Sequence, residues 1–284
     1  MYRRTLLAAL PTLAACTPSL GTFDAIAPRD AGGRQIVRDA AYGQSPRQRL
    51  DVYAPIETNG ALPVLIFFYG GSWRSGEKDD YNFLGAALAA QGFLTIIPNY
   101  RLVPEVRFPT FLDDCAQATR WIADNGAVHG GDPNRIVLAG HSAGAYNAIM
   151  LALDARLLQN AGVDAPRIRG AIGLAGPYDF LPFDVDATRN AFGAAPDPAQ
   201  TQPIQFARAD APPLLLLWGA DDRTVGRRNL EGLSAAMRGA GGAIESKVYQ
   251  EVDHIDILLA LSRPFRGRAP VLTDVSAFVH RVTA

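Results

Sequence analysis

Short apolar runs alternate with longer amphipathic segments along most of this 284-residue chain. Such runs are typical of strands buried on both faces, and the longer segments are typical of helices with one face on a core. The alternation predicts an α/β fold, in which helices cover both faces of a mainly parallel sheet. The expected strands are residues 62–69, 94–98, 135–139, 168–174, 214–218 and 243–249, and the expected helices are residues 81–91, 109–125, 145–159, 227–238 and 271–282.

Two further segments complete the predicted domain, which spans residues 34–284. Residues 48–53 alternate apolar and polar side chains, so we expect an antiparallel strand at the edge of the sheet. Residues 176–210 instead carry five prolines among five aromatic side chains, and a long insertion between strands is usually functional or disordered. The aromatic side chains favour a packed, cap-like insertion over a loose loop.

The first 15 residues have the composition of a signal peptide. Arg3 and Arg4 precede an apolar run that is too short to span a bilayer as a mature helix, and small residues follow it. The sequence Leu13-Ala-Ala-Cys16 resembles the bacterial lipobox, in which cleavage precedes a cysteine that receives lipid. We therefore expect a protein that begins at Cys16 and is lipid-anchored in the cell envelope. An ordinary secretory signal, which would give a secreted protein, is the alternative.

Residues 16–33 are expected to form a tether between this anchor and the domain, because they are rich in small residues, proline and glycine. Cys115 is the only other cysteine, so lipidation of Cys16 would leave no intramolecular disulfide. Cys115 shares one expected helical face with apolar residues, which indicates a core position and no catalytic role.

The pentapeptide Gly140-His-Ser-Ala-Gly144 lies between an expected strand and an expected helix. Small residues at both ends let a strained turn close and place the serine hydroxyl at the end of the sheet. Ser142 is therefore the candidate nucleophile, and it needs a base. His254 directly follows the last expected strand, so its loop would face the same edge of the sheet. The other three histidines precede the serine, adjoin it or fall within the last expected helix, which leaves His254 as the candidate base.

The acid of the expected triad follows the strand at residues 214–218. Asp222 lies in the loop after this strand, where it would orient the imidazole of His254. Asp221 is the close competitor for this role, and Asp253 is expected to help seat the histidine loop. The resulting chain order is serine, aspartate, histidine.

A serine nucleophile also needs backbone N–H groups that stabilise the oxyanion of the tetrahedral intermediate. One such donor usually comes from the residue after the nucleophile, which is Ala143 here. Gly70 and Gly71 directly follow an expected strand, and glycines there allow the backbone to approach a ligand closely. The expected oxyanion hole therefore consists of Gly70, Gly71 and Ala143.

The chain resembles the α/β-hydrolase superfamily over roughly residues 45–284, in its motifs and in the order serine, aspartate, histidine. The motifs are similar to those of the branch that contains hormone-sensitive-lipase-like carboxylesterases, feruloyl/acetylxylan-type esterases and kynurenine formamidases. They are Tyr69-Gly-Gly-Ser-Trp73, Asn99-Tyr-Arg-Leu-Val103, Gly131-Asp-Pro-Asn-Arg135 and Gly140-His-Ser-Ala-Gly144. The resemblance implies an α/β-hydrolase fold and supports the site residues given above. Tyr69 replaces the histidine that usually opens the oxyanion motif, which leaves the subgroup open.

The expected function is hydrolysis of small-molecule carboxylic esters through an acyl-enzyme, with no metal or organic cofactor. Two alternatives remain, which are an arylformamidase-like amide hydrolase and a non-catalytic binding protein on a hydrolase fold. A net charge of −1, from 27 lysines and arginines against 28 acidic residues, gives no support for nucleic-acid binding. The lipid anchor is the expected link to a membrane.

Overall fold

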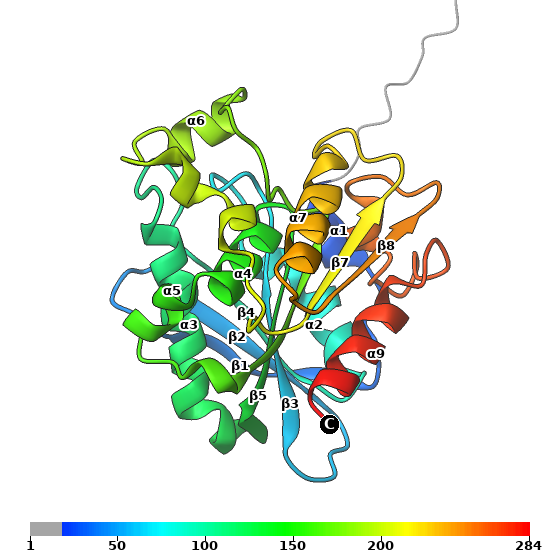
Figure 1. The fold of residues 1–284 in the computed structure, drawn as a ribbon. Coiled ribbons are helices and arrows are strands. Elements are labelled where there is room, and N and C mark those ends of the chain that lie inside the picture. Colours follow the sequence, from blue (N-terminus) through cyan, green and yellow to red (C-terminus); the bar gives the residue numbers. More distant parts are fainter. Residues whose placement is uncertain (1–18) are drawn as a thin grey trace, which may run out of the picture.

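The computed structural model describes residues 19–284, which contain one eight-stranded sheet (Figure 1). Its spatial order is β1-β2-β4-β3-β5-β6-β7-β8, in which β2 runs antiparallel to β1 and β4 and the remaining neighbours are parallel. The strands are β1 (Gly33–Ala41), β2 (Arg49–Pro55), β3 (Leu62–Phe68), β4 (Leu94–Pro98), β5 (Gly131–His141), β6 (Ile168–Leu174), β7 (Leu214–Gly219) and β8 (Ile244–Tyr249). The predicted α/β fold is confirmed.

The predicted edge strand at residues 48–53 is a strand, β2, but the prediction that it lies at the edge is wrong. β1 pairs outside it and forms the true edge of the sheet. The side chains of β1 are exposed or half-buried along its whole length, so β1 lacks the buried apolar run that marks the central strands.

Helices cover both faces of the sheet, with α2 and α9 on one face and α3 and α4 on the other (Figure 1). The α-helices are α1 (Leu20–Ile26), α2 (Asn82–Ala89), α3 (Thr110–Asn125), α4 (Ala143–Leu153), α5 (Ala155–Asn160), α6 (Asp186–Phe192), α7 (Arg228–Gly239), α8 (Asp256–Leu259) and α9 (Val271–Val282). The expected helix at 145–159 is two helices, because Asp154 ends α4 and its side chain caps α5. Among residues 19–284 we find no helix with the length and apolar character needed to cross a membrane.

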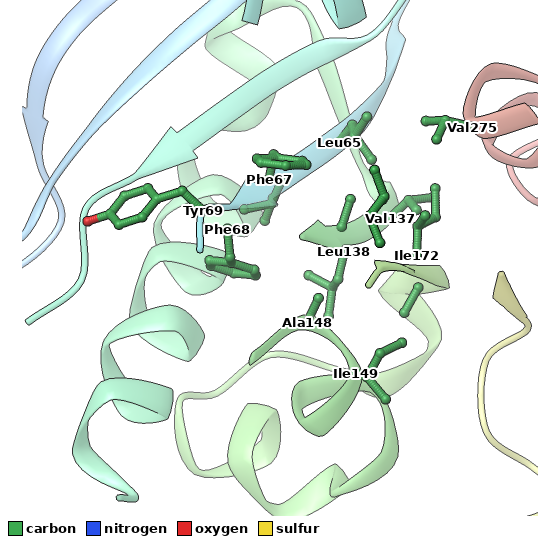
Figure 2. Packing of buried hydrophobic residues seen from close by; sticks show 14 of the residues in the cluster. Leu65, Phe67, Phe68, Tyr69, Val137, Leu138, Ala148, Ile149, Ile172 and Val275 are labelled. Carbon is green, nitrogen blue, oxygen red and sulfur yellow. The ribbon is translucent and has the colours of Figure 1, made fainter. Parts of the chain in front are cut away.

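The core lies on both sides of the central strands β3, β5 and β6 (Figure 2). Leu65 and Val137 point toward Val275 of α9, whereas Leu138 points toward Ile149 of α4 (Figure 2). All five side chains are buried. Successive strand residues therefore fill opposite faces, as expected for parallel strands covered by helices on both sides.

The expected tether at residues 16–33 is wrong for its described part from Leu20 onward, because this part is packed. Residues 20–26 form α1, whose first turn is capped by the side chain of Ser19. Phe23 packs edge-on against Phe83 of α2, with ring centroids 5.2 Å apart, and Asp24 is buried. The proposed signal peptide and Cys16 lie outside the described residues.

The insertion at residues 176–210 is packed, as expected from its aromatic side chains. It contains α6 and two short 3-10 helices, at Pro198–Thr201 and Pro203–Phe206. Phe180 and Phe192 are buried and contact Trp73 and Tyr146, with ring centroids 4.7 to 6.4 Å apart. These aromatic side chains therefore extend the core of the domain.

Candidate active site

Ser142 lies in a sharp turn between β5 and α4. Its backbone has φ 54° and ψ −121°, a conformation that non-glycine residues rarely adopt. A side chain at Gly140 would come within 2.2 Å of the carbonyl oxygen of Gly144, and one at Gly144 within 2.0 Å of that of Phe68. Both glycines are therefore required for the turn to pack against β3. The turn holds the serine hydroxyl at the carboxyl end of the parallel strands.

The structure brings Ser142, His254 and Asp222 together in one hydrogen-bonded chain. His254 Nε2 lies 3.0 Å from Ser142 Oγ, and His254 Nδ1 lies 2.7 Å from Asp222 Oδ2. A carboxylate only accepts hydrogen bonds, so Nδ1 carries the proton and Nε2 is free to accept the serine proton. This is the geometry of a nucleophile, its general base and the acid that orients the base.

Asp222, and not its neighbour Asp221, contacts the imidazole. The side chain of Asp222 is fully buried, and its second oxygen accepts the backbone N–H groups of Thr224 and Val225 at 2.8 and 3.0 Å. Asp221 is exposed. Asp253 accepts the backbone N–H groups of two following residues, which fits its expected role in seating the histidine loop.

The environment of Asp222 favours its ionised form. Burial alone raises the pKa of Asp222, but hydrogen bonds from His254 and from two backbone N–H groups outweigh burial and hold the pKa below its usual range. The carboxylate therefore remains negative and is suited to stabilise an imidazolium on His254.

The expected oxyanion donors border the serine. A side chain at Gly70 would make a tight contact of 3.0 Å with the Cβ of Ser142. Glycine is required at Gly71, because its φ is 120° and a side chain would come within 2.2 Å of the carbonyl oxygen of Ser75. Ala143 is the first residue of α4, and the first N–H groups of a helix have no acceptor within it. The structure therefore places Gly70 and Ala143 next to Ser142, with Gly71 in the adjoining loop.

Tyr69, which stands where a histidine was expected, is the centre of a buried network next to the oxyanion loop, the segment of residues 70–76. Its hydroxyl donates to Asn99 Oδ1 at 2.9 Å and accepts from Arg47 Nη2 at 2.9 Å. Arg47 also donates to the backbone carbonyls of Tyr100 and Gly76, and Gly76 closes the oxyanion loop. Sequence reasoning missed Arg47, because nothing near it in the chain marks it as part of the site.

His141, the residue before the nucleophile, is a second residue that sequence reasoning left without a role. It is buried, and its Nε2 donates to the backbone carbonyl oxygen of His254 at 2.7 Å. Burial and the neighbouring His254 lower the pKa of His141 from 6.5 to about 3. His141 is therefore a neutral donor that links the nucleophile turn to the histidine loop. Its place within the Gly140–Gly144 motif was the only signal in the sequence.

A cleft of about 910 Å³ opens onto Ser142 and His254. One wall carries large apolar side chains that come from α1, from α8 and from the loop after α8. They are Leu20, Phe23, Leu258, Leu259 and Phe265. Residues 176–210, which we expected to cap the site, contribute none of the side chains that line this cleft.

The remaining candidate groups of the sequence have other environments. Cys115 is fully buried, its thiol contacts Asn147, and burial raises its pKa, which fits the expected core position. His129 stacks on Trp121, and His280 contacts the backbone carbonyl of Gln91. Neither histidine contacts the triad.

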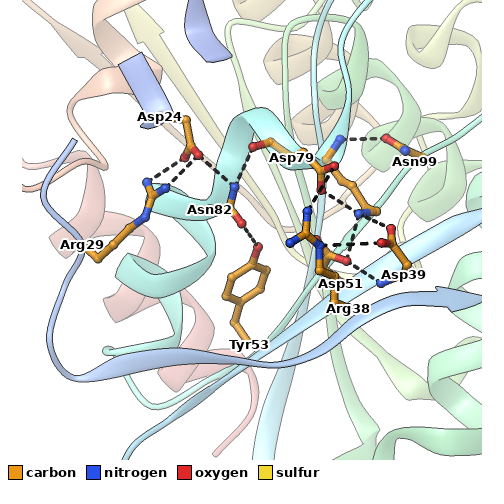
Figure 3. Close-up of polar contacts among 10 residues, drawn as sticks. Asp24, Arg29, Arg38, Asp39, Asp51, Tyr53, Asp79, Asn82 and Asn99 are labelled. Carbon is orange, nitrogen blue, oxygen red and sulfur yellow. Dashed lines mark hydrogen bonds and ion pairs between the residues drawn. The ribbon is translucent and has the colours of Figure 1, made fainter. Parts of the chain in front are cut away.

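Three carboxylates from Asp39, Asp51 and Asp79 lie close enough to share a cation (Figure 3). The ammonium of Lys78 occupies this position, at 2.6, 3.0 and 2.7 Å from them. Burial alone lowers the pKa of Lys78, but the bonds to the carboxylates outweigh burial and raise it. The ammonium of Lys78 therefore takes the place of a bound cation, and the cluster links the segment that follows Gly76 to β1 and β2.

The family model BD-FAE matches residues 50–237, which include the nucleophile turn and Asp222. The isoprenylcysteine alpha-carbonyl methylesterase ICME of Arabidopsis thaliana is 27% identical over 269 residues, which cover 87% of this chain and 62% of that protein. Esterase LipQ of Mycobacterium tuberculosis is 29% identical over 260 residues, which cover 85% of this chain and 61% of that protein. The chain thus matches about six-tenths of the length of these curated relatives.

Solved structures share the fold at low sequence identity. A truncated carbohydrate esterase from gut microbiota superposes with a TM-score of 0.78 at 20% identity, covering 90% of this chain and 99% of that one. The thermophilic carboxylesterase EstE1, cloned from a metagenomic library, gives a TM-score of 0.77 at 21% identity, covering 93% of each chain. These likenesses show the α/β-hydrolase fold.

Proposed function

Because this chain belongs to the BD-FAE family, we propose that it hydrolyses carboxylic esters through an acyl-enzyme on Ser142. The observation that carries this proposal is the continuous chain of hydrogen bonds from Ser142 Oγ through His254 to Asp222. The names of its relatives, which include a methylesterase and an esterase, support ester bonds as the target.

The first half of the reaction acylates the serine. Ser142 Oγ attacks the ester carbonyl carbon while His254 Nε2 takes the hydroxyl proton, and the carbonyl oxygen becomes an oxyanion that the oxyanion hole of Gly70, Gly71 and Ala143 would stabilise. When the carbonyl re-forms, the bond to the alcohol oxygen breaks and His254 delivers its proton to the leaving alcohol.

The second half returns the enzyme to its starting state. Water gives a proton to His254 Nε2 and its oxygen attacks the acyl carbon. Collapse of this intermediate breaks the bond to Ser142 Oγ, releases the carboxylic acid and returns the proton to the serine. Asp222 remains a carboxylate throughout and stabilises the transient imidazolium.

The decisive experiment compares Ser142→Ala, His254→Ala and the double variant on nitrophenyl acetate, with N-formylkynurenine as the amide substrate. Each single variant should lower kcat by about 10⁴-fold or more, and the double variant should lose little further, because the residues act as a unit. Melting temperatures serve as the control for folding. A serine-directed phosphonate should label wild-type protein at one residue and leave Ser142→Ala unlabelled.

The triad would be disproved if Ser142→Ala kept most of its ester hydrolysis. It would also be disproved if the loss of kcat in the double variant equalled the product of the losses in the two single variants. A kcat/KM for N-formylkynurenine well above that for every ester tested would instead identify an amide hydrolase. Activity that chelator removes and zinc restores would contradict a mechanism that uses only these side chains.

We also propose that the protein is anchored in the cell envelope through lipid on Cys16. The proposal is based on the lipobox-like sequence Leu13-Ala-Ala-Cys16, which resembles sites of lipid modification. Thr17, and not aspartate, follows this cysteine, which favours the outer membrane in a bacterium that has one. The catalytic domain would then work outside the cytoplasm.

A further inference from the structure

Helix α1 contributes two apolar side chains to the cleft that contains the proposed triad. Leu20 and Phe23 line this cleft together with Ser142 and His254, although more than 100 residues separate α1 from the serine in the sequence. Phe23 also approaches Phe265 across the cleft wall, with ring centroids 5.8 Å apart. Residues from the two ends of the domain therefore form one apolar wall.

The wall is only partly covered by the protein itself. Leu20, Phe23, Leu259 and Phe265 are half-buried, and each lines the cleft. Large apolar side chains that share one concave surface commonly mark a site where an apolar group of a ligand is buried. The cleft is also lined by polar groups, among them Ser72 and Ser75.

Helix α1 is held in place by a buried carboxylate, so the wall is formed before any substrate arrives. Asp24 is 4% exposed and accepts two hydrogen bonds from Arg29, at 2.8 and 2.9 Å (Figure 3). The same carboxylate accepts from Asn82 Nδ2 at 2.8 Å (Figure 3). It also accepts from the backbone N–H of Phe83 at 2.8 Å, at the start of α2.

A second ion pair holds the two sides of the wall together. Arg266, next to Phe265, donates to both oxygens of Asp30 at 3.0 and 2.9 Å. A seven-residue helix would be marginal by itself, so these ion pairs and the packing of Phe23 account for its position. Preorganisation of this kind lowers the entropic cost of binding a substrate.

We propose that Leu20 and Phe23 of α1, together with Phe265, bind the hydrocarbon part of the ester and set its preferred length. This inference rests on the proposed esterase function and specifies its substrates as esters with an apolar acyl or alcohol group longer than acetyl or methyl. The segment expected to act as a tether is thus a specificity-determining part of the site.

The test is the chain-length profile of the variant Phe23→Ala. Its kcat/KM is measured on nitrophenyl esters from acetate to octanoate and on acetates of alcohols of increasing length. The ratio of kcat/KM for the longest ester to that for the shortest should fall by about tenfold in at least one series, because the lost ring no longer covers the chain. Hydrolysis of the shortest ester should change little.

Ile26→Ala is the matched control, because Ile26 lies on the same helix, is 75% exposed and does not line the cleft. Its profile should equal that of the wild type. Leu20→Trp covers the case in which Phe23→Ala folds poorly, because added bulk in the cleft should reduce hydrolysis of long esters and spare acetate.

The outcomes separate this inference from the proposed function. Unchanged length profiles in folded Phe23→Ala and Leu20→Trp, with an active wild type, would overturn the role of α1 and leave the esterase intact. Equal changes of the length profile in Phe23→Ala and Ile26→Ala would also overturn it. The change would then arise from altering α1 in general and not from losing a side chain that lines the cleft. A wild type that hydrolyses no ester and resists phosphonate would refute the proposed function and this inference with it.

Discussion

The imidazole of His141 donates a hydrogen bond to the backbone carbonyl of His254, with 2.7 Å between Nε2 and the oxygen. The residue that precedes the candidate nucleophile thus holds the backbone of the candidate base. The two rings lie with their centroids 4.8 Å apart, and the ring of His141 is enclosed by protein. This contact joins the turn after β5 to the loop after β8 and helps to fix the distance between Ser142 and the base.

The first prediction concerns the stability of the protein in mild acid. The pKa of His141 falls from 6.5 to about 3 on folding, because burial and His254 disfavour a charged ring. Below about pH 6.5 the unfolded chain therefore binds a proton that the folded protein does not. The free energy of unfolding then falls by up to about 1.4 kcal/mol for each unit by which the pH is lowered. His141→Gln should remove this part of the pH dependence, measured by urea unfolding between about pH 7 and pH 5.

His280→Gln is the control for this experiment, because the ring of His280 is exposed. In this variant the free energy of unfolding should change with pH as it does in the wild type. An identical slope in wild type and His141→Gln would show that the ring takes up a proton in the folded state. His141→Gln should also lower kcat, since the loop that carries His254 loses one of its contacts.

The second prediction separates the two neighbouring aspartates. Asp222→Asn should lower kcat by about 10³- to 10⁴-fold, because an amide no longer fixes the tautomer of His254 or stabilises its charged form. Asp221→Asn changes the same charge on an exposed side chain, so its kcat should stay within about twofold of the wild type. Both variants are compared at one pH with nitrophenyl acetate. Equal losses would show that net charge near the site matters and that the hydrogen bond to His254 does not.

The third prediction concerns Tyr69 as a positioning residue. Tyr69→Phe removes the hydroxyl that joins Asn99 to Arg47, so the oxyanion loop should be held less firmly. We expect kcat to fall by about tenfold with little change in KM, since a displaced oxyanion donor affects the transition state more than substrate binding. Tyr53→Phe is the control, because it removes a tyrosine hydroxyl bonded to Asn82, outside this network. A loss of stability without a loss of kcat in Tyr69→Phe would limit Tyr69 to a structural role.

The fourth prediction concerns the proposed anchor. Full-length protein expressed in a bacterium should fractionate with membranes and incorporate labelled fatty acid, and Cys16→Ser should abolish both. Cys115→Ala is the control, because the second thiol is buried in the core and its loss should leave anchoring unchanged. Wild-type protein that stays in the soluble cytoplasmic fraction with Met1 in place would contradict the lipoprotein proposal.

The sequence by itself determined the parallel strands of the sheet and the location of the site. Buried parallel strands have short, continuous apolar runs that can be recognised without knowing their neighbours, and their carboxyl ends must meet at one edge. Ser142 and Asp222 follow such strands, and His254 follows β8, an edge strand whose side chains are mostly exposed or half-buried. The convergence of the three residues could therefore be predicted from the order of the expected strands. The spacing of the glycines around Ser142 also predicted the strained turn at this residue, because such a turn requires small residues at both positions.

Only the tertiary structure decided which side chains surround this chemistry. Asp221 and Asp222 are adjacent in the same loop, and their difference arises from which carboxylate the folded loop turns toward His254. Arg47 reaches the oxyanion loop from a distant segment, and α1 is a short helix among small residues that becomes stable only when Asp24 and Phe23 dock on α2. Local propensity depends on residues that are neighbours in the sequence, whereas these contacts join segments that are far apart in it. They therefore contribute to stability only once the chain has folded.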